Sequence, residues 1–220
     1  MKRLTVPILL FCLGATPVVF AVQGQVTYTE GEVTLRSGGA SRDIAIGDAL
    51  GPGDAIVTGA ASLAIIDLAN GTTVKLREKT TLAIDSIGEA TSVTLTAGAA
   101  FTSIARKLTG TFTLRAANAV AGVRGTEFFV AYGRTIDARP DVWLCVNRGA
   151  VEVSLPDTGQ SVLVNEGLGI NIVGGATITA PRPFAWTRRL NWNIDPSTGK
   201  VQDSTNLDQA YSDLLDQDYD

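Results

Sequence analysis

Short runs of alternating apolar and polar residues, separated by glycine-containing turns, fill the chain between Tyr28 and Thr179. In residues 42–48 (RDIAIGD), for example, Ile44 and Ile46 stand two positions apart ahead of a turn. Side chains two residues apart lie on the same face of a β-strand, so this period predicts strands with one buried face. The turns recur about every 8 to 12 residues, a spacing typical of a β-sandwich, a barrel or a β-solenoid.

One hairpin and one internal repeat are the clearest features of this pattern. Asn70-Gly71 separates two apolar runs and is the strongest short-range hairpin signal in the sequence. Residues 31–50 and 149–168 share one order: a glycine, an alternating run, a glycine-bearing turn, a second alternating run, and a corner where an acid adjoins a glycine. Two copies are fewer than a solenoid normally contains. The repeat indicates that both ends of the β region follow one plan, as in a short capped β-solenoid or a two-layer roll.

The first 21 residues have the features of a secretory signal peptide. Lys2 and Arg3 precede a long apolar run, and the small residue Ala21 closes it before a polar segment. We expect cleavage after Ala21, with Ala15 as the second choice. An uncleaved membrane anchor is the alternative, although the run barely reaches spanning length. Cleavage predicts an exported protein with no stable membrane insertion.

The composition changes after residue 180. Residues 181–220 contain two of the three tryptophans and end in an acidic stretch where Leu and Tyr recur at nearly helical spacing. This predicts an irregular segment packed on the β region, followed by a short amphipathic helix or a disordered tail. The chain thus divides into a signal peptide (1–21), an all-β domain (22–180) and a C-terminal segment (181–220).

The charge balance argues against nucleic acid and anionic membranes as partners. The chain carries 18 Lys and Arg and 22 Asp and Glu, a net charge of −4. Cleavage after Ala21 removes two cations and no acid, which lowers the net charge to −6. An acidic exported protein with no basic run lacks the attraction that polyanions require. Cys145 is then the only cysteine, inside an apolar run, so we expect no intrachain disulfide.

The sequence contains no histidine, which is its most informative absence. Histidine is the commonest general acid or base and the commonest zinc and copper ligand. The Ser-His-Asp and Cys-His nucleophile systems also need it. No phosphate-binding glycine loop is present in the sequence either. We therefore expect no enzyme activity, no cofactor and no metal.

Carboxylate pairs of the kind that glycosidases use remain as candidate chemistry. Asp48 and Asp54 each follow a glycine, so we expect them to cap turn N–H groups instead. Asp67 is expected at the surface beside its hairpin. The other candidates are Glu127, Asp137 and Asp141.

Residues 122–130 (GVRGTEFFV) place two charges in one of the longest uncharged stretches of the chain. Arg124 and Glu127 are three positions apart and would point to opposite faces of a regular strand. A bulge at Gly125 and Thr126 brings them to one side. They then form either a recognition site or a structural lock at a chain crossover. We favour the lock, because buried Arg and Glu are seldom unpaired.

A second candidate patch lies in the C-terminal segment. Trp186 and Trp192 flank Arg188 and Arg189, and Trp and Arg are enriched at the centres of protein interfaces. The other interpretation is that the tryptophan rings cover an open edge or end of the β domain.

Several motifs within residues 31 to about 130 resemble the FecR domain. They are the paired Gly-Asp corners in IGDALGPGDAIVTG (46–59), the hairpin DLANGTTVKL (67–76), the strand VTLTAG (93–98) and the closing AVAGVRGTEFFV (119–130). The resemblance implies an all-β, solenoid-like domain that is exported to the periplasm and acts in protein–protein signalling, not in catalysis.

In sensor members of that family, a cytoplasmic segment binds a sigma factor and a transmembrane helix separates it from the FecR domain. Here the signal peptide comes first, so we do not expect sigma-factor binding to carry over. The first hypothesis is an exported, non-catalytic FecR-like protein that binds another cell-envelope protein. The alternative is a carbohydrate-binding or carbohydrate-processing β-solenoid that uses acidic residues and exposed tryptophans. A third is a purely structural envelope protein.

Overall fold

The computed structural model describes residues 24–105, 110–123, 125–136 and 139–207, which form two nine-stranded β-sheets. The expected signal peptide and most of the expected C-terminal helix or tail lie outside the described residues. Within the described part of the chain, no helix is long and apolar enough to cross a membrane. The prediction of an all-β fold is confirmed.

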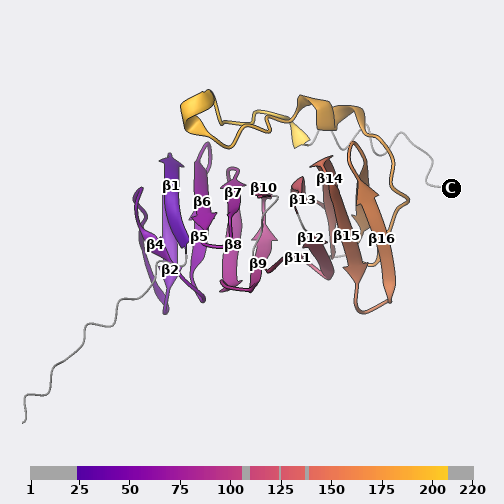
Figure 1. Cartoon of the computed structure of the whole chain (residues 1–220), viewed down its shortest axis with the longest axis horizontal. Coiled ribbons are helices and arrows are strands. Elements are labelled where there is room, and N and C mark those ends of the chain that lie inside the picture. The colour runs from indigo at the N-terminus through magenta and orange to yellow at the C-terminus, as the bar shows by residue number, and fades with distance from the viewer. Residues whose placement is uncertain (1–23, 106–109, 124, 137–138, 208–220) are drawn as a thin grey trace, which may run out of the picture.

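The strands carry the labels of Figure 1. Sheet A runs in the order β18 (Thr177–Ile178), β17 (Gly169–Val173), β14 (Arg139–Arg148), β13 (Glu127–Ile136), β10 (Ala99–Ile104), β7 (Thr72–Leu76), β6 (Leu63–Leu68), β1 (Gly24–Glu30) and β4 (Ala49–Leu50). Sheet B runs in the order β16 (Gln160–Asn165), β15 (Ala150–Leu155), β12 (Ala119–Val123), β11 (Thr111–Ala116), β9 (Ala90–Ala97), β8 (Thr81–Ser86), β5 (Ala55–Thr58), β2 (Val33–Ser37) and β3 (Ala40–Asp43).

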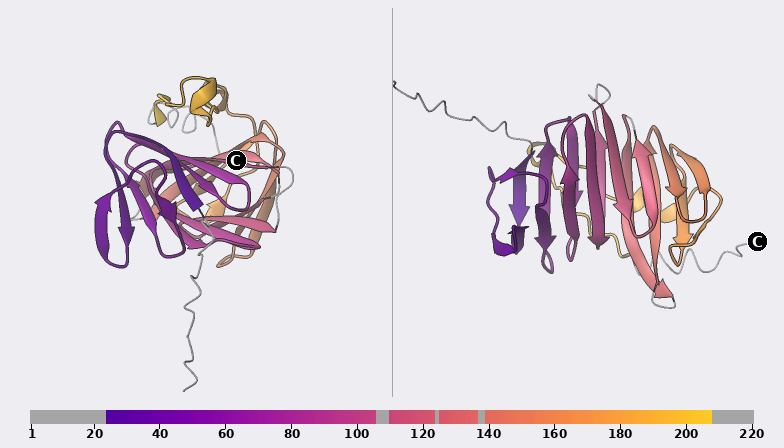
Figure 2. Two further views of the ribbon diagram at one scale, coloured as in Figure 1. Left: turned by 60° about the vertical axis from the view of Figure 1, so that its left-hand side comes forward. Right: turned by 90° about the horizontal axis from the view of Figure 1, so that it is seen from below.

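One hydrophobic core fills the space between the two sheets, which lie face to face (Figure 2). Its largest side chains include Ile56, Leu82 and Phe112 from sheet B, each at most 1% exposed. In β9 and β11 every second residue is buried, and the residues between them are partly or fully exposed. Sheet B therefore has one core face and one solvent face, as the alternating sequence pattern predicts.

The central strands of sheet A are buried on both faces. Residues 142–146 of β14 are at most 3% exposed without any alternation. Phe128 and Phe129 of β13 are both fully buried, although successive side chains of a strand point to opposite faces. Phe128 enters the core between the sheets, and Phe129 belongs to a second cluster on the outer face. A continuous apolar run is typical of a strand that is covered on both sides.

The chain passes repeatedly from one sheet to the other. Nearly all neighbouring strands within each sheet are antiparallel. Strands β6 and β7 form the predicted hairpin around Asn70-Gly71, with Asp67 opposite Thr73. Among the described strands, β9 and β11 are the only parallel neighbours, because the chain crosses to sheet A as β10 between them.

The two copies of the internal repeat form the opposite edges of sheet B. The first copy gives the β2–β3 hairpin and the second gives the β15–β16 hairpin. The corners that follow are also equivalent. The N–H of Gly47 donates to the carbonyl of Val26 at 2.8 Å, and the N–H of Gly167 donates to the carbonyl of Val146 at 2.8 Å. The prediction that both ends follow one plan is confirmed for these hairpins. The expected strand through Ile44 and Ile46 is not formed, because β3 ends at Asp43 and the chain turns there, which buries Ile44 and leaves Ile46 61% exposed.

Gly98, between β9 and β10, provides a test of how tightly the chain turns from one sheet to the other. Its φ is +78°, and a Cβ there would lie 2.3 Å from Oγ1 of Thr80. Gly39 has a similar φ of +85°, but a Cβ there has no neighbour within 4 Å. We predict that Gly98→Ala lowers the free energy of unfolding by about 3 kcal/mol, through close contact as well as positive φ. Gly39→Ala is the control and loses only about 1 kcal/mol, the cost of a positive φ alone. Equal losses in urea denaturation would contradict the tight-packing explanation.

Candidate functional site

Residues 181–207 lie across the outer face of sheet A and are called the strap here (Figures 1 and 2). The strap contains two short 3-10 turns, η1 (Ala185–Arg189) and η2 (Pro196–Thr198). An outgoing arm (181–195) runs along the sheet to η2, and a returning arm (199–207) runs back next to it. The side-chain amide of Asn191 joins the two arms by donating to two carbonyls of the returning arm, at 2.8 and 2.9 Å. The predicted irregular segment is thus a two-armed cover.

Aromatic rings hold the strap on the sheet. Trp186 is 2% exposed, and its ring centroid lies 5.6 Å from that of Trp143 and 6.2 Å from that of Phe129. Trp192 meets Phe101 edge to face at 5.3 Å. The rings therefore cover a sheet face, and not an edge or an end of the sheet. The same cluster includes Ala99, Ala131, Cys145, Phe184 and Leu190.

The first turn of the strap sits closely against β17. Arg182 and Gly169 exchange two main-chain hydrogen bonds, at 2.9 and 3.1 Å. A Cβ on Gly169 would lie 3.0 Å from the ring of Phe184 and 2.9 Å from the carbonyl oxygen of Leu144. Gly169 therefore gives the strap room to turn onto the sheet.

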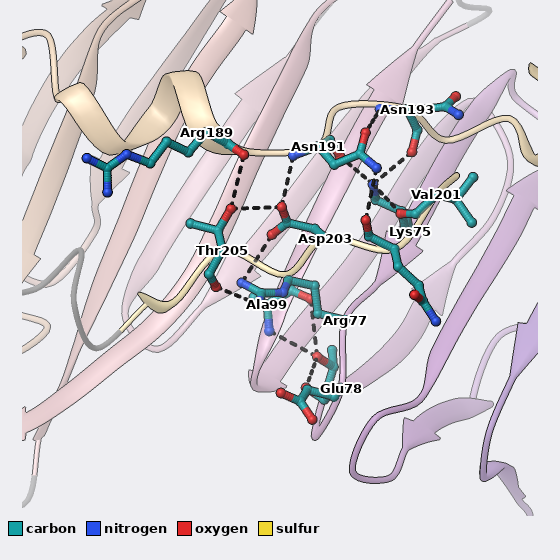
Figure 3. Close-up of polar contacts among 12 residues, drawn as sticks. Lys75, Arg77, Glu78, Ala99, Arg189, Asn191, Asn193, Val201, Asp203 and Thr205 are labelled. Carbon is teal, nitrogen blue, oxygen red and sulfur yellow. Dashed lines mark hydrogen bonds and ion pairs between the residues drawn. The ribbon is translucent and has the colours of Figure 1, made fainter. Parts of the chain in front are cut away.

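Lys75 of β7 lies beneath the strap with its side chain fully buried (Figure 3). Its Nζ donates to three strap carbonyls, those of Asn191 at 2.6 Å, Asn193 at 2.8 Å and Val201 at 3.1 Å. An ammonium group has three N–H donors, so all of them are used. Because the acceptors come from both arms, one side chain fixes both arms to the sheet.

The surroundings of Lys75 act on its charge in opposite directions. Burial lowers the pKa of Lys75 to about 8, and the carboxylate of Asp203 acts against this shift. The Nζ also lies 4.0 Å from the centroid of the Phe101 ring, a distance at which the ring face attracts a cation. Neutral pH is below this pKa, so the side chain of Lys75 is a charged ammonium.

A buried ion pair anchors the returning arm beside Lys75. Arg77 Nη1 lies 3.4 Å from Asp203 Oδ2, and the two side chains are 11% and 1% exposed. Arg77 Nη2 donates to the carbonyl of Thr205 at 2.9 Å. The other carboxylate oxygen of Asp203 accepts the N–H of Asn191 at 2.9 Å and the hydroxyl of Thr205 at 2.8 Å. Removing one charge leaves the other buried without its partner, so the pair fixes the position of this arm.

The predicted crossover motif forms a corner next to the strap. Arg124, and with it the predicted Arg124–Glu127 lock, lies outside the described residues. Gly125 has a φ of +66°, so the chain bends here as expected. Thr126 is buried, and its carbonyl accepts the N–H of Ile104 at 2.9 Å.

Glu127 has partners that the sequence analysis did not name. It forms an ion pair of 2.9 Å with Arg148, and it accepts the side-chain N–H of Asn147 at 2.9 Å. The side chains of Arg148 and Glu127 are 40% and 25% exposed, so water screens the pair and its contribution to stability is small. The pair orients the corner more than it stabilises the fold.

An open groove of about 690 Å³ separates this corner from the strap. Asn147 and Glu166 line one side, and Phe184, Arg188 and Trp192 of the strap line the other. Because Asn147 also binds Glu127, the groove joins two patches that the sequence predicts separately. The pocket is partly aromatic and partly polar, which suits binding more than acid–base chemistry.

Two of the predicted strap residues serve other purposes. Trp186 is inside the outer-face cluster. The side chain of Arg189 is exposed, and its main-chain carbonyl accepts the hydroxyl of Thr205 at 3.2 Å.

The candidate acidic residues cap turns or face solvent. Asp48 and Asp54 each accept a turn N–H at 2.9 Å, as predicted. Asp67 is exposed beside its hairpin, and buried Asp141 accepts a turn N–H at 2.6 Å. Asp137 lies outside the described residues. In the part of the chain that the structure describes, no three His, Cys, Asp or Glu residues gather as a metal site.

No pattern in the sequence singles out the charged residues that hold the strap, Lys75, Arg77 and Asp203. The first two alternate with buried Val74 and Leu76, a pattern that predicts solvent-facing charges. One signal was present, because the unbroken apolar runs of β13 and β14 require a cover on the outer face.

Comparison with known proteins supports the resemblance seen in the sequence. The family model described as FecR protein matches residues 54–152. The resemblance to the FecR domain is therefore confirmed. The matched region includes all of β7, with Lys75, and ends before the strap. No curated protein matches the chain.

Two crystal structures of a candidate anti-sigma factor from Parabacteroides distasonis ATCC 8503 are similar to this structure. In both comparisons the TM-score is 0.50 and the sequence identity is 20%. The match covers 59% of this chain and 59% of the other, so the chain spans less than two thirds of those proteins. At this identity the likeness concerns the fold alone.

Lys75→Met tests the anchoring of the strap. Methionine keeps a long apolar side chain next to Phe101 but removes the donor for three carbonyls. We predict a loss of about 1–3 kcal/mol in the free energy of unfolding and faster amide exchange of strap residues than in the wild type. The control is Lys200→Met, which changes an exposed lysine of the strap itself. Unchanged stability and unchanged strap exchange in Lys75→Met would show that the ammonium does not hold the strap.

The pKa of Lys75 also sets the sign of a pH effect. It is about 8 in the folded chain, below the ordinary value of 10.5 expected for the unfolded chain. Between these values the unfolded chain binds more protons at this group, so this contribution to stability rises with pH. We predict that the free energy of unfolding of the wild type, relative to Lys75→Met, increases from pH 8 to pH 10.5 and is flat below pH 8. A decrease would mean that the three carbonyls raise the pKa instead.

Proposed function

We propose, on the premise that residues 54–152 are FecR-type, that this chain is a non-catalytic regulatory module of the cell envelope that binds another protein. The family resemblance supports a role in protein–protein signalling. The crystal structures of similar fold carry the name of a regulator, an anti-sigma factor, which agrees with such a role. The partner proposed here is a protein of the envelope.

The groove between the strap and the Glu127 corner is the observation that carries this proposal. Its volume of about 690 Å³ accommodates several side chains of a partner. Trp192 is partly exposed and Arg188 is exposed at its rim, and these residue types dominate the binding energy of protein interfaces. The ring of Trp192 is held in place by Phe101, so little conformational entropy is lost when a partner binds.

The envelope location is the second part of the proposal. It rests on the signal-peptide pattern of residues 1–21 and on the family resemblance. Export also agrees with the acidic composition and with a single cysteine after cleavage.

The roll-like or short-solenoid architecture expected from the sequence also belongs to this proposal. The path from β9 through β10 to β11 supports it, because this path returns the chain to the same sheet in the parallel direction. The antiparallel hairpins on both sides then act as caps of a single coil.

The nearby carboxylates argue against the carbohydrate-processing alternative, because they are engaged by other groups. Glu127 is paired with Arg148, and Glu166 accepts the N–H of Gly149 at 3.2 Å. A glycosidase needs one carboxylic acid and one free carboxylate facing its substrate.

Site-specific photo-crosslinking tests the proposed function. A photo-reactive amino acid is placed at position 188 of the full chain, or at position 36 on the solvent face of sheet B as a control. The chain is expressed in its native host, and the envelope fraction is irradiated. We predict one dominant crosslinked protein from position 188 and none from position 36.

Trp192→Ala supplies the matched loss-of-binding variant for this experiment. It should reduce the crosslinked product from position 188 at least about tenfold, as expected for a hot-spot residue. Identical products from both positions, or no effect of Trp192→Ala, would contradict the proposed function.

A further inference from the structure

We propose that the outer face of sheet A is a second, covered binding face, and that its partner is a peptide segment with aromatic side chains that folds back on itself as the strap does. In the free protein the strap occupies this face, and the partner segment replaces it. The strap also forms one wall of the groove described above, so the groove exists only while the strap is seated. The proposal rests on the proposed function only in taking a protein as the partner.

The face binds mainly the backbone of the strap. Lys75 donates to three main-chain carbonyls, and Arg77 donates to the main-chain carbonyl of Thr205 (Figure 3). Every peptide carries such carbonyls, whatever its side chains. The same donors therefore fit a foreign segment that doubles back and presents carbonyls from two adjacent arms, as the strap does.

Apolar side chains around these donors give the face its preference for aromatic residues. Phe101, Phe129 and Trp143 lie on the outer face and are each at most 1% exposed beneath the strap. The strap meets them with Trp186 and Trp192. An uncovered face of this kind would be a large exposed apolar patch, so an occupant is needed at all times. A partner that displaces the strap must supply comparable rings.

The strap can leave without disturbing the two sheets. Between described residues, it shares main-chain hydrogen bonds with sheet A only at Arg182, which pairs with Gly169. The cluster under the strap is separate from the core between the sheets.

The returning arm is the place where a partner segment can begin to replace the strap. Two open hollows lie against this arm, of about 250 Å³ and 510 Å³. Ser62 and Glu78 line the first with Asp203 and Ser204, and Gly98 and Tyr132 line the second with the same two strap residues. The returning arm thus borders open space on two sides of its anchor, the Arg77–Asp203 pair.

The experiment uses a fluorescent peptide that copies residues 181–207 and the full-length chain. Asp203→Ala removes the anchor of the returning arm but no residue of the face itself. We predict that this variant binds the peptide at least about tenfold more tightly than the wild type, a difference of 1.4 kcal/mol. Asp85→Ala is the matched control, since Asp85 accepts two hydroxyl hydrogen bonds on sheet B, far from the strap. It should bind the peptide as the wild type does.

Two further variants tie the peptide to the face. A peptide with Trp186 and Trp192 replaced by Ala should not bind the Asp203→Ala protein. The unchanged peptide should not bind the Lys75→Met/Asp203→Ala double variant. A folded Asp203→Ala chain with wild-type affinity for the peptide overturns the proposal. A strap-exchanged dimer of Asp203→Ala that the peptide does not dissociate also overturns it, because the occupant is then a second copy.

If Asp203→Ala does not fold, amide exchange of the wild type tests whether the strap opens separately from sheet A. The N–H of Asn191, bonded to Asp203, reports on the strap, and the N–H groups of Phe129 and Leu144 report on sheet A. Exchange at Asn191 that is faster than at both strand positions and insensitive to low urea supports a separately opening strap. Equal protection at all three positions overturns it. None of these measurements uses the groove or the native partner, so the proposed function stands or falls separately.

Discussion

The apolar outer face of sheet A is the constraint on which the rest of the structure depends. Each aromatic side chain on it removes roughly 150–250 Å² from water, at about 25 cal/mol per Å². Burial of Phe101, Phe129 and Trp143 together therefore contributes about 11–19 kcal/mol, which is comparable to the whole net stability of a typical domain, about 5–15 kcal/mol. Sheet B covers only the inner face. The C-terminal strap is the second cover, and the groove at the Glu127 corner exists because the strap passes over that corner.

Charged groups decide where the strap lies on this face. Apolar contacts are non-directional, so rings alone would allow the strap to shift along the sheet. The ammonium of Lys75 and the Arg77–Asp203 pair require particular carbonyl and carboxylate positions. Their desolvation makes them poor sources of net stability but good sources of a defined register. The strap is held by a few polar contacts on an apolar face, so a segment with similar carbonyls and rings can replace it.

Much of the candidate site could be predicted, but in separate pieces. Arg188 and Trp192 were identified from residue type, and Glu127 from its place in an uncharged stretch. The groove that joins them depends on Asn147, which is distant from both in the chain and meets them only after β13 and β14 pair. Lys75 could not be identified, because a charge on the outer face of a strand is exposed unless another segment happens to cover it.

The sequence by itself determined the all-β class, the hairpin at Asn70-Gly71 and the equivalent ends of sheet B, since turn chemistry and period-two alternation act between near neighbours. It also determined that β13 and β14 need cover on two faces, through their unbroken apolar runs. Only the tertiary structure decided which segment supplies that cover, and that it lies on a face and not an edge. Burial of Lys75 by carbonyls more than a hundred residues away is a long-range event, and no local pattern encodes it.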